Sequence, residues 1–346
     1  MHATTMPSFQ ELAMPVVEQG SRSVFRAALL VILVAMLTVT LQQWVGTLSI
    51  YSDAVAEKRL MLHDAILHNR RPLEGWHEFG ADRTNVRIFT VYLAQGLHRA
   101  TGASVLSAYK LIETIALFSV FLGLFAYLRA WTPPSLALVG LLYFAVVTTL
   151  TYHFYFFHPW DHPSLLCWII GAMFIRDGRF VPLMWLLPIA VTVKWDIIVL
   201  PCLYWLTHCS RDSFKLVTLR TLALGAVAIA TLLVLAKSFP GGADRLETAS
   251  LWDITRWQVS HNWQQFLALH ISYPPLLAFG LPLVFASYGF RLAGRFLRVS
   301  CLFAVALFFP LMLNSFFVET RAQMMILALL LPTALVGLSR VLEPNN

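Results

Sequence analysis

Residues 24–48 read VFRAALLVILVAMLTVTLQQWVGTL, an apolar run that is long enough to cross a bilayer as a helix. The apolar core of a signal peptide has about 7–15 residues and is followed by a small-residue cleavage site. This run is longer and no such site follows it, so it predicts a retained membrane span. The polar residues 1–23 before it are expected to lie in the cytoplasm.

The composition of the 346-residue chain is that of a membrane protein. Hydrophobic residues make up 58% and charged residues 12%, with a mean hydropathy of +0.69. Soluble domains carry about 25% charged residues, so a soluble domain is excluded. A disordered chain is also excluded, because disordered chains have low hydrophobicity. The net charge of +7 indicates arginines in short cytoplasmic loops, and no nucleic-acid partner is expected.

Further apolar runs predict an all-α polytopic membrane protein with about eight to ten transmembrane helices. Three runs between 163 and 207 are shorter than the roughly 20 residues of a full crossing, so they are expected to use flanking aromatics or to be broken helices. The expected spans are 24–48, 105–128, 135–152, 163–175, 180–193, 195–207, 216–236, 268–290, 299–316 and 323–341. Residues 1–346 are expected to form one membrane-embedded domain.

The distribution of basic residues predicts the orientation of these spans. If the N-terminus lies in the cytoplasm, the short loops on the cytoplasmic side hold most of the arginines. The short loops on the other side then hold only two basic residues, Lys194 and Arg321. Short cytoplasmic loops collect positive charge, so both termini are expected in the cytoplasm. Two longer loops, 49–104 and 238–267, are then outer loops of a protein expected in the bacterial plasma membrane.

The first outer loop predicts two amphipathic helices in the membrane interface. Wound at about 100° per residue, one side of 53–68 is acidic and the other apolar. Arg59 interrupts the apolar side, and an ordinary solvated face is the alternative interpretation. A second amphipathic piece, 86–100, stops near Gly102. The acidic side of the first piece holds Asp53, Glu57, Asp64 and His68.

This order of a span, an acidic residue directly outside it, two interfacial helices and a further span resembles the GT-C superfamily of polytopic glycosyltransferases, which use polyprenyl-phosphate sugars. Many members have an Asp-Glu pair at the catalytic position, where this chain has Ser52-Asp53. Members often also carry a soluble C-terminal domain, which is not expected here. The segments that carry the resemblance are NVRIFTVYLAQGLHRATGASVLSAYKLIET (85–114), TYHFYFFHPWDHPSLLCWIIGAMFIRDGR (151–179), VKWDIIVLPCLYWL (193–206) and FVETRAQMMILALLLPTALVGL (317–338).

The resemblance implies inverting transfer of a sugar from a polyprenyl-phosphate donor to a glycan, lipid or protein acceptor at the outer membrane face. The attacking hydroxyl needs a carboxylate base within hydrogen-bond reach. Asp53 matches the catalytic position of the family, and Glu57, one turn later, is a candidate helper or metal ligand. The alternative for Asp53 is a helix N-cap.

The leaving lipid phosphate needs a cation to stabilise its developing charge. Lys194 and Arg321 lie at the correct face for this role, with Glu319 beside the arginine. Charged groups at a bilayer edge are usually paired or functional. The alternative is mutual neutralisation, of Lys194 by Asp196 and of Arg321 by Glu319.

The loop HFYFFHPWDHP (153–163) is expected to line the donor or acceptor pocket through His158, Asp161 and His162. Histidine and carboxylate are also ligands of divalent metal cations, so a metal is a possible cofactor. An aromatic anchor in the membrane interface is the third interpretation.

Two further functions stay open. Transporters place paired charges near the midplane and often contain internal repeats, and no repeat is evident here, so a transporter or lipid flippase is less favoured. The single acid at the catalytic position also allows a non-catalytic GT-C-like subunit of an envelope assembly.

Overall fold

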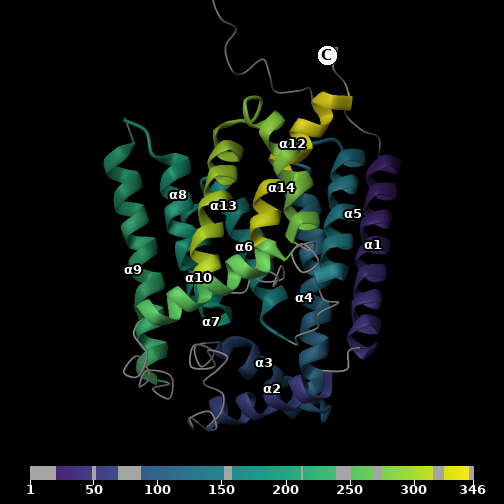
Figure 1. The fold of residues 1–346 in the computed structure, drawn as a ribbon, viewed down its shortest axis with the longest axis vertical. Coiled ribbons are helices and arrows are strands. Elements are labelled where there is room, and N and C mark those ends of the chain that lie inside the picture. Colours follow the sequence, from purple (N-terminus) through teal and green to yellow (C-terminus); the bar gives the residue numbers. More distant parts are fainter. Residues whose placement is uncertain are drawn as a thin grey trace, which may run out of the picture.

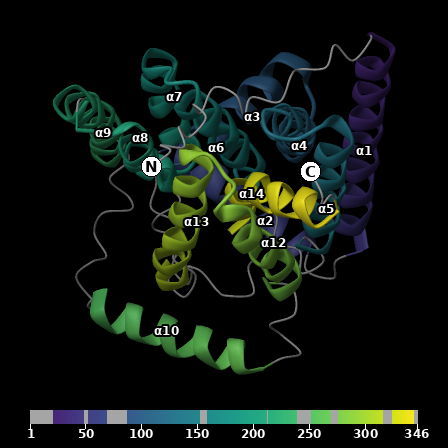
Figure 2. The same cartoon turned by 90° about the horizontal axis from the view of Figure 1, so that it is seen from above.

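The computed structural model describes residues 21–48, 52–68, 87–151, 158–211, 213–238, 251–268, 275–314 and 323–342. Every regular element in these segments is a helix, which confirms the all-α prediction (Figure 1). Most of the helices form an upright bundle, and α2 (Ser52–Leu67) and α3 (Ile88–Thr101) lie across its lower end (Figure 1). α10 (Leu251–Leu267) lies along one side of the bundle (Figure 2).

The bundle helices follow the predicted apolar runs closely. The run 195–207 is divided between a 3-10 helix, η4 (Trp195–Val199), and α8 (Leu200–His208). Within the run 268–290, the described residues include a π-helical turn, η6 (Leu276–Gly280), that leads into α12 (Leu281–Phe290). The other bundle helices are α1 (Ser21–Leu48), α4 (Val105–Leu128), α5 (Pro134–Thr151), α6 (Asp161–Arg176), α7 (Phe180–Val193), α9 (Phe214–Ser238), α13 (Arg295–Asn314) and α14 (Met324–Leu342).

Five helices of the described segments are long and apolar enough to cross a membrane, namely α1, α4, α5, α9 and α14. Large apolar side chains are exposed along the outside of the bundle, such as Leu33 on α1 (61% exposed) and Leu219 on α9 (65%). Contiguous apolar surface of this extent is rare on soluble monomers and fits contact with lipid. The predicted count of eight to ten spans is reached if at least three of the other bundle helices also cross the membrane. These helices are α6, α7, α8, α12 and α13.

The two ends of the bundle differ. The first turn of α1 and the last turn of α14 lie at the upper end, together with the link between α8 and α9 (Figure 1). The predicted orientation, with both termini in the cytoplasm, requires α1 to begin and α14 to end on the same side of the membrane. α2 and α3 lie at the opposite end, which the arginine pattern predicts to be the outer one.

The core of the bundle is centred on α14, whose side chains from Met324 to Leu335 are all buried. α12 packs against it backbone to backbone at Gly289 and Gly337. A Cβ atom on Gly289 would lie 2.7 Å from the Gly337 nitrogen, and one on Gly337 would lie 2.8 Å from the Gly289 nitrogen. Small residues allow such close approach of helices in membranes.

We expect Gly289→Ala and Gly337→Ala each to destabilise the protein, by about 1–3 kcal/mol, because the added methyl group forces the two helices apart. The control is Gly225→Ala in α9, where an added Cβ meets nothing within 4 Å and alanine favours the helix. Thermal unfolding in detergent measures the difference. Equal midpoints for all three variants would contradict the close packing.

Candidate functional site

The crosswise helices α2 and α3 form a platform that is fixed to the bundle by a small apolar cluster. Leu62 and Ile66 of α2 and Val91 of α3 are buried against Trp160 and against Val193 of α7. Fully burying each such aliphatic side chain contributes about 1.5–3 kcal/mol. The predicted apolar side of α2 is therefore confirmed, while Glu57, Asp64 and His68 on the acidic side are exposed.

A buried polar network also joins the platform to the bundle. Nδ1 of His63 lies 2.8 Å from the Tyr109 hydroxyl, and Nε2 lies 3.1 Å from Oε1 of Gln95. Burial lowers the pKa of His63, which favours the neutral ring. The neutral ring fits this geometry, since Nδ1 accepts from Tyr109 while Nε2–H donates to Gln95. The network links α2, α3 and α4.

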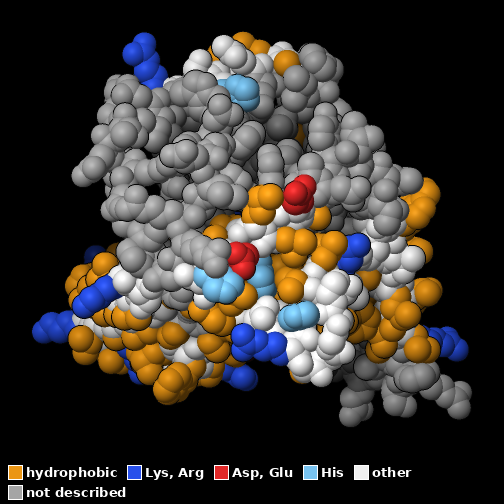
Figure 3. Space-filling model, turned by 90° about the horizontal axis from the view of Figure 1, so that it is seen from below, with side chains coloured by type: hydrophobic (Ala, Val, Ile, Leu, Met, Phe, Trp, Pro, Cys, Tyr) orange, Lys and Arg blue, Asp and Glu red, His pale blue; other side chains and the backbone are white. Residues whose placement is uncertain are grey.

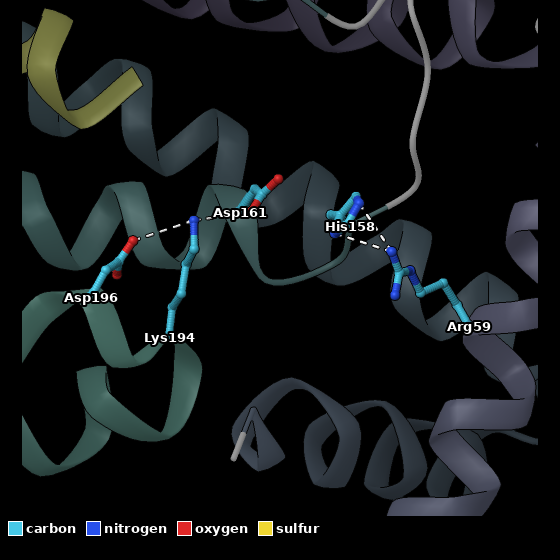
Figure 4. Close-up of polar contacts among 5 residues, drawn as sticks. All are labelled: Arg59, His158, Asp161, Lys194 and Asp196. Atoms are coloured by element: carbon cyan, nitrogen blue, oxygen red, sulfur yellow. Dashed lines mark hydrogen bonds and ion pairs between the residues drawn. The ribbon is translucent and has the colours of Figure 1, made fainter. Parts of the chain in front are cut away.

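The Trp160 cluster lies where the platform meets the start of α6, and it consists of Arg59, Arg87, His158 and Trp160. Trp160 is only 1% exposed. The guanidinium carbons of Arg59 and Arg87 lie 4.9 and 4.6 Å from the centre of its ring. Arg59 also donates to His158 at 3.0 Å (Figure 4). The buried Nε1–H of Trp160 has no hydrogen-bond acceptor among the described residues.

Beside it lies the Lys194 triad, in which one ammonium group contacts two carboxylates (Figure 4). Nζ of Lys194 is 3.4 Å from Oδ1 of Asp161 and 3.3 Å from Oδ2 of Asp196. Asp161 lies in the first turn of α6, where the helix dipole favours its negative charge. The expected pairing of Lys194 with Asp196 is observed, and the second partner, Asp161, was not predicted.

His162 lies one residue further along α6 and is also buried. Its Nε2 lies 3.4 Å from Nε2 of Gln42 in α1. Four of the predicted site residues, His158, Asp161, His162 and Lys194, are thus brought together between the bundle and the platform. From below, acidic, basic and histidine side chains are seen among hydrophobic ones on this end of the molecule (Figure 3).

The other predicted site residues are only partly placed. Asp53 lies in the first turn of α2, but its side chain is outside the described residues. Glu57 is exposed on α2. Glu319 and Arg321 lie outside the described residues. Within the segments that the structure describes, no group of three or more His, Cys, Asp or Glu side chains could hold a metal ion.

Arg59 and Arg87 of the Trp160 cluster were not among the site residues predicted from the sequence. The signal for Arg59 was its position on the apolar side of α2, which points it toward the protein. Arg87 immediately precedes α3, so no helical period indicates its direction. Three cations, Arg59, Arg87 and Lys194, lie in this region together with the carboxylates of Asp161 and Asp196. Guanidinium groups are strong hydrogen-bond donors to anions such as carboxylate and phosphate.

We expect Lys194→Met to destabilise the protein by about 3–5 kcal/mol, because it leaves two buried carboxylates without their cation. The combination Asp161→Asn, Lys194→Met and Asp196→Asn removes all three charges and should recover most of that loss. Thermal unfolding of the purified protein measures both variants. A fully stable Lys194→Met variant would contradict the triad.

Comparison with known proteins gave no match: no family model, no curated protein and no solved structure is similar to the chain.

Proposed function

We propose that the protein is a membrane glycosyltransferase that transfers a sugar from a polyprenyl-phosphate donor to a glycan, lipid or protein acceptor. In this proposal it has a GT-C-like arrangement of eight to ten spans, and it acts at the outer face of the bacterial plasma membrane. The observation that carries the proposal is the Trp160 cluster, in which two guanidinium groups contact a buried indole at the end of the bundle that α2 covers.

The cluster has the chemistry of a lipid-phosphate site. Guanidinium groups match the geometry of phosphate oxygens and are less strongly hydrated than ammonium groups. The indole N–H of Trp160 is a further buried donor that a phosphate oxygen could satisfy. A sugar phosphodiester carries one negative charge, which suits a cluster that holds two guanidinium groups. The apolar outside of the bundle gives the polyprenyl chain a surface on which to approach.

Asp53 is the proposed general base. The acceptor oxygen forms a bond to the anomeric carbon of the sugar, and the bond from that carbon to the phosphate oxygen breaks, with its electron pair leaving on the phosphate. The hydroxyl proton passes to the Asp53 carboxylate. Attack from the face opposite the phosphate inverts the anomeric centre. Asp53 lies on α2, and contacts of His63, Leu62 and Ile66 fix this helix to the bundle.

We expect Arg59→Ala and Arg87→Ala each to weaken binding of polyprenyl phosphate, by roughly 10- to 100-fold, because each removes a charged donor to phosphate. Arg99→Ala is the matched control, since Arg99 is an exposed arginine of the same platform. Binding to the full-length protein in nanodiscs measures the effect. If both test variants bound polyprenyl phosphate with unchanged affinity, the proposed phosphate site would be wrong.

We expect Asp53→Asn to lower sugar transfer by about 10²–10⁴-fold while polyprenyl phosphate still binds, because the amide cannot accept the hydroxyl proton. Asp64→Asn is the control, an exposed acid of the same helix. Release of polyprenyl phosphate from a panel of polyprenyl-phosphate sugars measures turnover.

The same experiment separates the other functions. Full activity of Asp53→Asn in an envelope-assembly assay would favour a non-catalytic subunit. Movement of polyprenyl phosphate across sealed vesicles without any sugar donor would favour a lipid flippase.

A further inference from the structure

Two hollows lie along the pair of helices α8 and α9 at the edge of the bundle, which we treat together as one groove. The link between these two helices is at the end of the bundle opposite the platform (Figure 1). At the upper end the groove widens into a hollow of about 770 Å³, lined by Cys209, Ser210, Arg211, Phe214 and Lys215. Further along the same two helices is a hollow of about 360 Å³, lined by Cys202, Trp205, Leu206, Thr218, Thr221 and Leu222. The lining residues of the first hollow lie in the link after α8 and in the first turn of α9, about one turn from those of the second hollow. The two hollows therefore follow one another along one helix pair.

The charged side chains that line the upper hollow, among the residues that the structure describes, are basic. Arg211 and Lys215 are exposed at its rim. A third cation, Arg295, donates to the carbonyl oxygens of Leu206 and Cys209 at the end of α8. The first turn of α9 adds the positive end of a helix dipole. Asp212, the acidic residue of this segment, lies outside the described residues.

The second hollow is apolar and faces the surroundings of the bundle. Leu222 is 64% exposed beside it. The Trp205 indole donates to the Thr218 hydroxyl at 3.1 Å, which fixes the ring as one wall. The buried hydroxyl oxygen of Thr221 has no partner among the described residues. Because α9 is long and apolar enough to cross the membrane, the groove leads from the membrane surface toward the hydrocarbon.

We propose that this groove binds a phospholipid with an anionic headgroup. The phosphate lies between Arg211 and Lys215, and one acyl chain lies along Trp205, Leu206 and Leu222. A zwitterionic headgroup is disfavoured because its ammonium group would meet the same cations. A water-soluble phosphate would leave the apolar hollow without an occupant. The site is independent of the proposed sugar transfer, which lies at the other end of the bundle.

Two native thiols report on the two parts of the groove. Cys209 lines the basic hollow, and Cys202, an exposed thiol, lines the apolar one. The full-length protein in detergent is treated with N-ethylmaleimide, and labelling is followed by mass spectrometry of the digested chain. With phosphatidylglycerol present, we expect labelling of Cys202 and Cys209 to slow at least fivefold, and phosphatidylcholine to have little effect.

The variant Arg211→Ala with Lys215→Ala should lose this protection at Cys202. The control variant Arg179→Ala with Arg291→Ala removes two exposed arginines from other links between bundle helices and should keep it. Equal protection by both lipids in the unaltered protein would overturn the proposal. So would protection of Cys209 alone by glycerol phosphate with none of Cys202 by phosphatidylglycerol, which would indicate a soluble anion.

Discussion

The contact of two arginines with the buried ring of Trp160 is the interaction on which the platform end of this protein depends. Arg59 comes from α2, Arg87 from the residue before α3, and Trp160 from the turn before α6. Three segments far apart in the sequence therefore meet at one indole. A guanidinium over a shielded aromatic ring contributes about 2 kcal/mol or more. The interaction positions the platform, and with it the helix that carries Asp53, over the end of the bundle.

The two ends of the bundle hold their cations differently. At the platform end, arginines and Lys194 lie in a buried setting together with carboxylates, where charge is expensive unless it is compensated. At the opposite end, Arg211 and Lys215 are exposed on the rim of a groove that continues into apolar surface. Both arrangements suit phosphate on a lipid. Under the two proposals, the first would enclose a reacting group, whereas the second would leave room for a lipid that stays in the bilayer.

The sequence predicted local structure well and contacts between distant residues poorly. Apolar period and length located the bundle helices, the buried side of α2 and the stop at Gly102, whose φ is 72°. The segment 238–267 was expected only as an outer loop, yet it contains α10, and the spacing of Val259, Trp263 and Phe266 was the available signal. Periodicity shows which side of a helix is apolar. It does not show which helix that side meets, so the 33-residue separation between Lys194 and Asp161 concealed their contact.

The Lys194 triad decides which cations the proposed phosphate meets. Lys194 already contacts two carboxylates, and both would repel an arriving phosphate. Its ammonium group is therefore better explained as the support of Asp161 and Asp196 than as the main phosphate contact. The guanidinium groups of Arg59 and Arg87 both lie over the ring of Trp160, at the junction of platform and bundle. In the proposed reaction, this division would leave recognition of the donor to the arginines and would keep the proposed base, Asp53, on a separate part of α2.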